Sequence, residues 1–302
     1  MIPRELFRTI RHVEVRTRGL VDDVFGGAYH SAFKGRGIEF AEVRPYQVGD
    51  DVRTIDWNVS ARTGEPYVKL FDEEREQTLV LAVDVSASQG FGSGRAAKRD
   101  VAAEICAVLG FSALRNHDRV GLLLFSDRVE RFVEPAKGRR HVLRIVRDLF
   151  VHGADGRGTS LAAPLEHLGR AMRRRAIVVL VSDFLAVDAA AAARALRVAG
   201  RRHDLVAVRL TDPRERELPA GAGLVRAVDP ESGREVVLDT GSRSVRDAFA
   251  ARAEARDAEA AALLAEARVD HVTLDVSEEY ADPLAAFFRQ RNRQRRAPRR
   301  LR

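Results

Sequence analysis

The run Leu79–Val83 holds five consecutive apolar residues and ends at an aspartate, Asp84. A short, continuous apolar run of this kind predicts a strand that is buried on both faces, as inner strands of a parallel sheet are. Parallel strands need long crossover connections, which are usually helices. This run therefore favours an α/β fold, provided that further strands and helices alternate after it.

From Thr78 onward, apolar runs of strand length alternate with segments of helical periodicity. Strands are expected at 78–84, 119–125, 129–133, 176–182, 204–210 and 271–276, and helices at 94–116, 138–150, 160–173, 187–199, 242–267 and 281–293. This alternation predicts a doubly wound, mainly parallel sheet with helices on both faces. Residues 211–241, rich in proline and glycine, predict an exposed excursion that carries a hairpin.

Residues 1–76 have a different texture and are expected to form a separate N-terminal region. Apolar residues recur near helical spacing over 4–24, and Gly26-Gly27 is expected to end that helix. Over 28–76, short apolar pieces are broken by Gly and Pro without helical periodicity, which predicts a small β-rich or irregular appendage. The α/β domain would then cover 77–288.

The only tryptophan, Trp57, lies in this expected appendage. We expect its ring to pack the appendage against the main sheet. An exposed ring at this position would instead be a recognition anchor.

The net charge of +7 comes from the last fourteen residues, 289–302, which hold eight Arg and no acid. Without them the formal charge is −1, so the basic character belongs to an expected Arg-rich tail. Such a tail is either a solvated helix end or a tether for nucleic acid or an acidic partner. The chain has no basic face interleaved with aromatic residues, so nucleic-acid binding is not favoured.

Composition also limits the compartment. The single cysteine excludes an internal disulfide framework, and no apolar run approaches the roughly 20 residues that span a bilayer. The N-terminal residues lack the apolar core of a signal peptide. We therefore expect a cytoplasmic protein without a membrane span.

Oxygen-bearing side chains follow two of the expected strands. Asp84, Ser86 and Ser88 end the first strand, Asp183 follows another strand, and Thr159 precedes a helix after a glycine-rich loop. Ligands of doubly wound sheets bind beyond the carboxyl ends of the strands. If the strands that carry the two aspartates are neighbours, five oxygen donors converge on one point, and hard cations such as Mg²⁺ prefer such donors. The same residue types also serve as helix caps and turn formers.

The order D-x-S-x-S, then a distant Thr, then a distant Asp after an apolar strand resembles the metal-ion-dependent adhesion site (MIDAS) of von Willebrand factor A domains. The resemblance implies that the three hydroxyls bind Mg²⁺, or Mn²⁺, while the two aspartates bind directly or through water. It also implies an open coordination position for a carboxylate from a partner protein.

The region upstream of the first strand resembles the signature of a bacterial family, domain of unknown function 58. The resemblance to this family extends over roughly residues 15 to 215. The features that carry the resemblance are Arg44-Pro45-Tyr46, Gly49-Asp50-Asp51, Arg53, Ile55-Asp56-Trp57 and Ser60-Ala61-Arg62. Members resemble von Willebrand A proteins and are typically encoded beside MoxR-type AAA+ ATPases. The resemblance implies a metal-dependent adaptor that works with such an ATPase on a client protein.

The sequence supports nucleotide binding and metal-assisted hydrolysis less well than a protein-binding role. Gly90-Phe91-Gly92-Ser93-Gly94 follows a strand, but Arg95 stands where a dinucleotide-binding G-x-G-x-x-G motif needs its third glycine. A metal-assisted hydrolase would require a general base, and no His or third acid is evident at these strand ends. We therefore expect a non-enzymatic binding protein, with the hydrolase as the alternative.

Overall fold

The computed structural model describes residues 20–21, 29, 39–72, 76–94, 96–153, 158–185, 188–230 and 233–296. These residues fall into two compact units, one within Phe33–Gln77 and the other containing the rest. The helix expected over 4–24, except residues 20 and 21, and the glycine pair expected to end it lie outside the described residues.

The smaller unit is built on an antiparallel strand pair. Its elements are β1 (Glu39–Pro45), the 3-10 turn η2 (Val52–Thr54), helix α3 (Trp57–Thr63) and β2 (Tyr67–Asp72). The strand pair confirms the expected β-rich appendage, and helix α3 is an element that the prediction did not include. Asp56 caps the helix by accepting hydrogen bonds from two backbone N–H groups, and Gly64 ends it in the left-handed conformation at φ 78°.

Trp57 opens α3 and is 71% exposed, so its ring is not buried within the smaller unit. The bidentate pair of Arg44 and Asp50, with contacts of 2.8 and 2.7 Å, holds the loop after β1.

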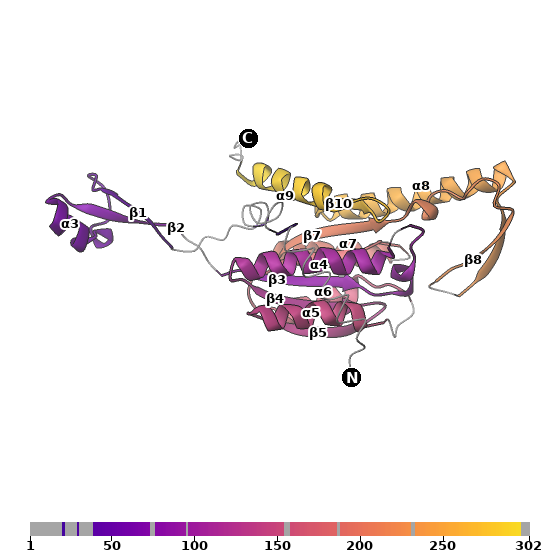
Figure 1. Cartoon of the computed structure of the whole chain (residues 1–302), viewed down its shortest axis with the longest axis horizontal. Coiled ribbons are helices and arrows are strands. Elements are labelled where there is room, and N and C mark those ends of the chain that lie inside the picture. Colours follow the sequence, from indigo (N-terminus) through magenta and orange to yellow (C-terminus); the bar gives the residue numbers. More distant parts are fainter. Residues whose placement is uncertain are drawn as a thin grey trace. The chain divides into compact units, whose positions relative to one another are not determined.

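The larger unit contains a six-stranded sheet, which confirms the predicted fold class (Figure 1). Its strands are β3 (Thr78–Asp84), β4 (Arg119–Phe125), β5 (Val129–Ala136), β6 (Ile177–Ser182), β7 (Asp204–Thr211) and β10 (Asp270–Asp275). They lie in the order β10-β7-β6-β3-β4-β5, with only β5 antiparallel to its neighbour. The chain builds outward in opposite directions from β3, so the strand order reverses between β3 and β6.

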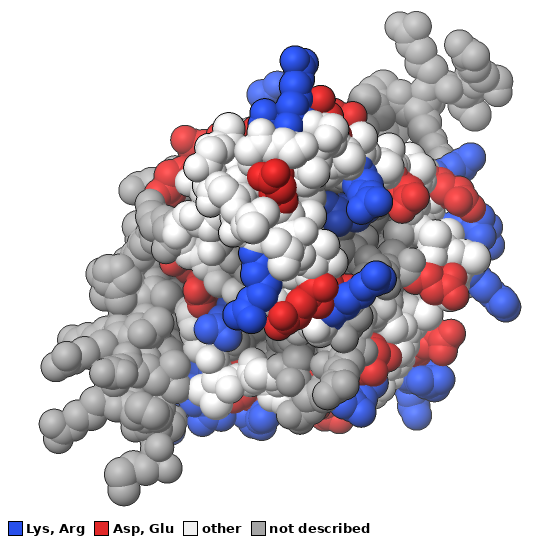
Figure 2. Space-filling view, turned by 90° about the vertical axis from the view of Figure 1, so that its right-hand side faces the viewer, with Lys and Arg blue, Asp and Glu red and all other residues white. Residues whose placement is uncertain are grey.

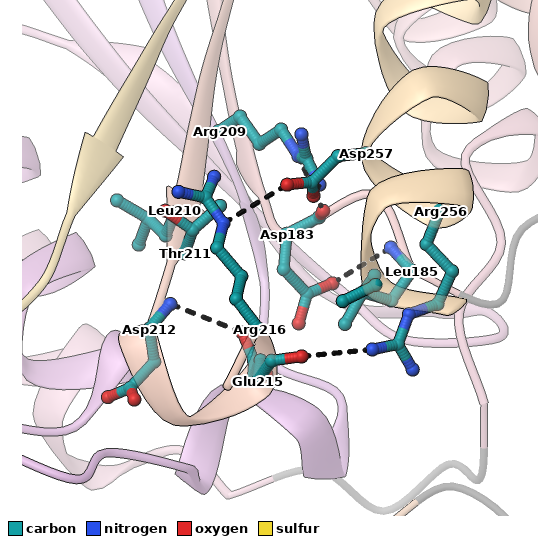
Figure 3. A pocket seen from close by; sticks show the side chains of 11 residues that line it. Asp183, Leu185, Arg209, Leu210, Thr211, Asp212, Glu215, Arg216, Arg256 and Asp257 are labelled. Atoms are coloured by element: carbon teal, nitrogen blue, oxygen red, sulfur yellow. Dashed lines mark hydrogen bonds and ion pairs between the residues drawn. The ribbon is translucent and has the colours of Figure 1, made fainter. Parts of the chain in front are cut away.

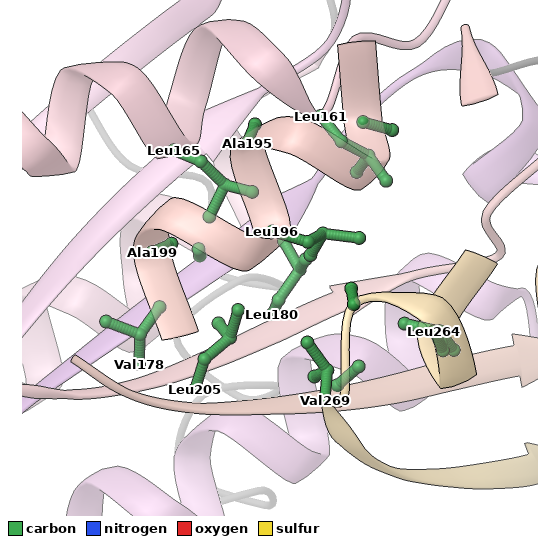
Figure 4. Close-up of a cluster of buried hydrophobic side chains, with 14 of the residues drawn as sticks. Leu161, Leu165, Val178, Leu180, Ala195, Leu196, Ala199, Leu205, Leu264 and Val269 are labelled. Atoms are coloured by element: carbon green, nitrogen blue, oxygen red, sulfur yellow. The ribbon is translucent and has the colours of Figure 1, made fainter. Parts of the chain in front are cut away.

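Helices cover both faces of this sheet. They are α4 (Lys98–Arg115), α5 (Arg139–Val151), α6 (Ala162–Ala171), α7 (Ala189–Arg202), α8 (Arg243–Glu266) and α9 (Ala281–Arg296). Figure 1 shows α4 and α5 side by side over one face. The buried cluster in Figure 4 joins α6, α7 and α8 to the other face, where Leu165, Leu196 and Leu264 meet Val178 and Leu180 of β6.

Burial on both faces explains why the inner strands β3 and β6 are almost entirely apolar. Successive residues of β6 point to opposite faces, and all six are buried. Each large aliphatic side chain buried in this way contributes about 1.5–3 kcal/mol. The sheet is therefore a stable platform for the side chains that follow its strand ends.

The excursion after β7 carries the expected hairpin, formed by β8 (Leu224–Val228) and β9 (Glu235–Asp239). The expected Arg-rich tail needs a correction, because its residues up to 296 belong to α9. Arg291 is only 3% exposed, and it donates hydrogen bonds to Asp270 at 2.7 Å and to Asp204. Its charge stabilises the fold and does not belong to a solvated tail.

Candidate metal centre

The two predicted aspartates lie at the reversal of strand order. Asp84 is the last residue of β3, and Asp183 directly follows the last residue of β6. The two strands pair in parallel, with Val83 opposite Val181. Their carboxyl ends therefore meet at one edge of the sheet, where doubly wound folds bind ligands.

The hydroxyls of the D-x-S-x-S segment lie on the turn that follows β3. The Ser86 N–H donates to Asp84 Oδ1 at 2.9 Å, and the Ser86 and Ser88 hydroxyl oxygens lie 3.1 Å apart. The 3-10 turn η3 (Ala87–Gly90) then curls the chain over the strand end. All three side chains are buried, at 1–3% exposure.

Thr159 reaches the same end of the sheet from a different segment. Gly158 precedes it at φ 90°, which favours glycine, and the Ser160 N–H donates to the carbonyl of Ser126, just after β4. Because β4 pairs with β3, this places the Thr159 loop beside the strand that carries Asp84. The Thr159 side chain is buried, and its hydroxyl oxygen has no hydrogen-bond partner in the described part of the chain.

An unpartnered buried hydroxyl costs about 1–3 kcal/mol, so native proteins rarely keep one without a ligand, ion or water to satisfy it. The Thr159 oxygen is one of the donors expected to bind a cation. Its lack of a protein partner fits that assignment.

Asp84 is held in an environment that disfavours its negative charge. Burial raises its pKa to about 7, the nearby Asp183 charge adds to the shift, and hydrogen bonds from Ser182 and Ser86 oppose it. The Ser182 hydroxyl donates to Asp84 Oδ2 at 2.6 Å. A bound cation would relieve the repulsion between the two carboxylates, so the electrostatics also fit a cation site.

The donor set consists of carboxylates and hydroxyls. Among the described residues, no group of three or more His, Cys, Asp or Glu side chains is arranged to hold a metal ion. A cation here would therefore depend on the serine and threonine oxygens as well as on the two aspartates. Such an all-oxygen set suits Mg²⁺ or Mn²⁺ and does not suit softer metals.

Sequence reasoning missed a buried lysine beside this site. Lys98, the first residue of α4, is 0% exposed, and its Nζ lies 2.6 Å from Asp183 Oδ2 and 2.6 Å from Glu215 Oε1. Burial lowers the pKa of Lys98, but the two carboxylates raise it by more, so the ammonium stays charged. The sequence contains an indication that Lys98 is buried, because Lys98 lies one helical turn before Val101 and Ile105, on the apolar side of the helix.

Glu215 was missed as well, although it lies in η4 (Pro213–Glu215), just beyond the end of β7. Burial raises the pKa of its carboxyl, and the neighbouring Lys98 offsets only part of that shift. Applied to β7, the strand-end rule that identified Asp183 selects Asp212, which directly follows the strand, whereas Glu215 lies further along in η4. The site therefore has a third carboxylate, and the structure pairs it with an ammonium.

The loop between η3 and α4 is hydrogen-bonded to the residue that follows β7. The Ser93 N–H donates to Asp212 Oδ2 at 2.7 Å, next to η4. A Cβ at Gly92 would lie 2.5 Å from the carbonyl oxygen of Ala96, so this turn requires glycine. Gly92 is thus explained by the close approach of the backbone at Ala96.

A hollow opens on the Asp183 side of the centre (Figure 3). Around it, Arg209 donates to the Asp183 carbonyl at 3.3 Å, and Arg256 donates to the Glu215 carbonyl at 3.0 Å. Asp257 pairs with both Arg209 and Arg216. The hollow therefore adjoins the candidate metal centre through Asp183 and Glu215.

None of the helices in the described part of the chain is long and apolar enough to cross a membrane.

Comparison with known proteins identifies the family. A family model described as "Protein of unknown function DUF58" matches residues 42–259. Uncharacterized protein Rv1480 of Mycobacterium tuberculosis is 34% identical over 294 residues, which cover 96% of this chain and 90% of the relative. Uncharacterized protein YeaD of Bacillus subtilis is 28% identical over 149 residues, which cover 49% of this chain and 35% of that protein.

Two solved structures are similar to this chain. An aerotolerance-related membrane protein from Bacteroides fragilis aligns with a TM-score of 0.50 at 14% identity, over 72% of this chain and 99% of that one. A von Willebrand factor type A protein from Catenulispora acidiphila aligns with a TM-score of 0.43 at 15% identity, over 75% of this chain and 43% of that one. The chain belongs to the DUF58 family, and its larger unit has a doubly wound, mainly parallel α/β fold with helices on both faces.

Proposed function

We propose that this protein is a metal-dependent protein-interaction module that binds an acidic side chain of a partner. Its cation, Mg²⁺ or Mn²⁺, would be held by Asp84, Ser86, Ser88, Thr159 and Asp183. The observation that carries the proposal is the buried hydroxyl of Thr159, which has no hydrogen-bond partner among the described residues and belongs to a loop hydrogen-bonded to the end of β4. The raised pKa of Asp84 supports it, since burial and the nearby Asp183 charge cause the shift and a bound cation would offset both.

The bound ion would supply a positive centre with an open coordination position. Mg²⁺ prefers near-octahedral oxygen coordination and keeps several waters when few carboxylates bind it. The residues of this chain hold and orient their oxygens, and the apolar sheet beneath them excludes water. A carboxylate from a partner is a fitting last ligand, because the two aspartates alone leave the ion incompletely neutralised once Lys98 offsets Asp183.

We propose a MoxR-type AAA+ ATPase, or a client of that ATPase, as the partner that provides the carboxylate. The support is the resemblance of the chain to families typically encoded beside such ATPases, together with the interaction role common to von Willebrand A-like folds. Trp57, exposed on α3, is a candidate second contact because exposed tryptophans are frequent anchors of interfaces.

Pull-down of a MoxR-type AAA+ ATPase from the same source organism tests the proposal. We expect the wild-type protein to retain the ATPase in Mg²⁺ and to lose it in EDTA, and the Asp84→Ala variant to lose it in both. Asp247→Ala is the matched control, because Asp247 lies exposed on α8 and pairs only with Arg243 in the adjacent turn. Equal retention in EDTA and Mg²⁺, or by Asp84→Ala, would show that the metal centre is not the binding site.

The other two roles receive less support from the described residues. Glu215, the one additional carboxylate identified beside the centre, is paired with Lys98 and is therefore poorly suited to act as a general base. On the face shown in Figure 2, Lys and Arg side chains lie among Asp and Glu side chains, without a continuous basic field. We therefore do not propose hydrolysis or nucleic-acid tethering.

A further inference from the structure

A buried ammonium beside a proposed cation site requires an explanation. Lys98 is one of only four lysines among the 51 basic residues of this chain, and its side chain is completely buried. Burying a charge is costly unless it is paired, and here two carboxylates from different elements, Asp183 and Glu215, pair with it. A compact ammonium fits between two carboxylates in a way that the planar arginine fork does not.

The position of the ammonium matters because Asp183 is one of the proposed metal ligands. Asp183 Oδ2 accepts from Lys98 at 2.6 Å, and Oδ1 accepts from the Leu185 N–H at 3.1 Å. Both oxygens are thus engaged before any metal binds. A divalent ion that approached this carboxylate would share it with a neighbouring positive charge.

We propose that Lys98 competes with the divalent ion for Asp183 and thereby lowers the affinity of the centre for metal. Lys98 is a positioning residue that acts through Asp183 and does not itself bind the metal. This inference rests on the proposed function, since it assumes that the five oxygen donors hold a cation. Its consequence is a centre that binds metal weakly by itself and gains affinity when a partner carboxylate adds negative charge.

The charges of the cluster show why removing the ammonium should matter. Asp84, Asp183 and Glu215 together with Lys98 carry a formal charge of −2 when all are ionised, and without the ammonium the charge becomes −3. A single neighbouring charge commonly changes a proton-binding equilibrium by about 1–3 pKa units. For a divalent ion near the same carboxylate we therefore expect a change in affinity of at least about tenfold.

Titration of the full-length protein with Mn²⁺, followed by the electron paramagnetic resonance signal of the free ion, tests this inference. We expect Lys98→Met to bind Mn²⁺ at least about tenfold more tightly than the wild type. The double variant Lys98→Met/Glu215→Gln restores the formal charge of the cluster to −2. It also removes the buried acid that Lys98→Met leaves unpaired, so it can be tested if the single variant does not fold. If competition at Asp183 is the cause, the double variant also binds more tightly than the wild type.

The direction of the effect separates competition from damage to the fold. A variant that merely loosens the site loses metal affinity, whereas only removal of a competing cation raises it. Lys137→Met is the control, because Lys137 is exposed in the turn before α5 and its loss should leave the affinity unchanged.

The outcomes also separate the two proposals. If the wild type binds Mn²⁺, Asp84→Ala does not, and the folded Lys98 variants bind no more tightly than the wild type, the competition is refuted while the metal centre stands. If the folded wild type binds no Mn²⁺, or if Asp84→Ala binds as the wild type does, the proposed metal centre fails and the inference fails with it.

Discussion

The hydroxyl of Thr159 allows a prediction whose sign depends on whether metal is present. The side chain is buried and its oxygen has no partner, so Thr159→Val replaces a hydroxyl by a methyl group of similar size without breaking a protein hydrogen bond. Removing a buried, unpartnered polar group relieves a desolvation cost of about 1–3 kcal/mol. In EDTA we therefore expect Thr159→Val to raise the free energy of unfolding by about 1 kcal/mol or more.

In saturating Mg²⁺ the order should reverse. A ligand that binds only the folded state stabilises it by about 2.7 kcal/mol at a concentration one hundred times its dissociation constant. The wild type should gain this stability, and Thr159→Val should gain much less because it lacks one oxygen donor. Thr159→Val should therefore have the higher free energy of unfolding in EDTA, and the wild type should have the higher one in Mg²⁺.

Urea denaturation followed by circular dichroism, in EDTA and in Mg²⁺, measures both effects. Thr240→Val is the matched control, because Thr240 is also buried but its hydroxyl donates to the Gly223 carbonyl at 2.8 Å. That control should lose about 1 kcal/mol in both buffers. If Thr159→Val is destabilised in EDTA and gains as much from Mg²⁺ as the wild type, the assignment of Thr159 as a metal ligand is wrong.

Three further predictions use the same denaturation assay on the metal-free protein. The folded state keeps the Asp84 proton up to about pH 7, whereas the unfolded chain releases it near its ordinary pKa of 3.8, so stability should fall by on the order of 4 kcal/mol as pH rises through this window. Asp84→Asn should remove this fall in stability with pH. If the variant shows the same pH dependence as the wild type, the assignment of this fall to Asp84 is wrong. Lys98→Met should lower the free energy of unfolding by about 3–5 kcal/mol, because it leaves buried carboxylates unpaired. Adding Glu215→Gln should recover part of this stability. A decrease below about 1 kcal/mol in Lys98→Met would show that the ion pairs of Lys98 contribute little to stability. Arg291→Met should cost about 3 kcal/mol, whereas Arg293→Met, exposed on the same helix, should change stability by less than about 0.5 kcal/mol; equal effects would contradict the anchoring role of Arg291.

The architecture of the larger unit was predictable because its strands and helices carry strong local patterns. The apolar run of β3 and the hydrophobic stripe of α4 each determine their own element type, and the observed bounds of β3 are those expected. The short helix α3 was missed because seven residues give too little periodicity, and only Asp56 and Gly64 mark its ends.

The candidate site was partly predictable from the sequence, because most of its residues lie next to recognisable strands. Asp84, Ser86 and Ser88 are close in sequence, and Asp183 follows a recognisable strand, so the doubly wound topology alone brings these residues to one edge. Thr159 could be added because it follows a glycine-rich loop and precedes a helix. Whether these oxygens bind a metal remains the prediction that the experiments above address.

The sequence by itself determined the α/β alternation, the strand ends and the types of side chain placed there, because these depend on short-range periodicity and on chain order. Only the tertiary structure decided which charges meet. Lys98, Asp183 and Glu215 are separated by up to 117 positions in the sequence. In the structure, Lys98 Nζ lies 2.6 Å from a carboxylate oxygen of each acid. Arg291 likewise leaves the basic C-terminal run to pair with Asp204, 87 positions away. The energy of an ion pair depends on separation and burial in space, and neither quantity is encoded in the local pattern of a chain.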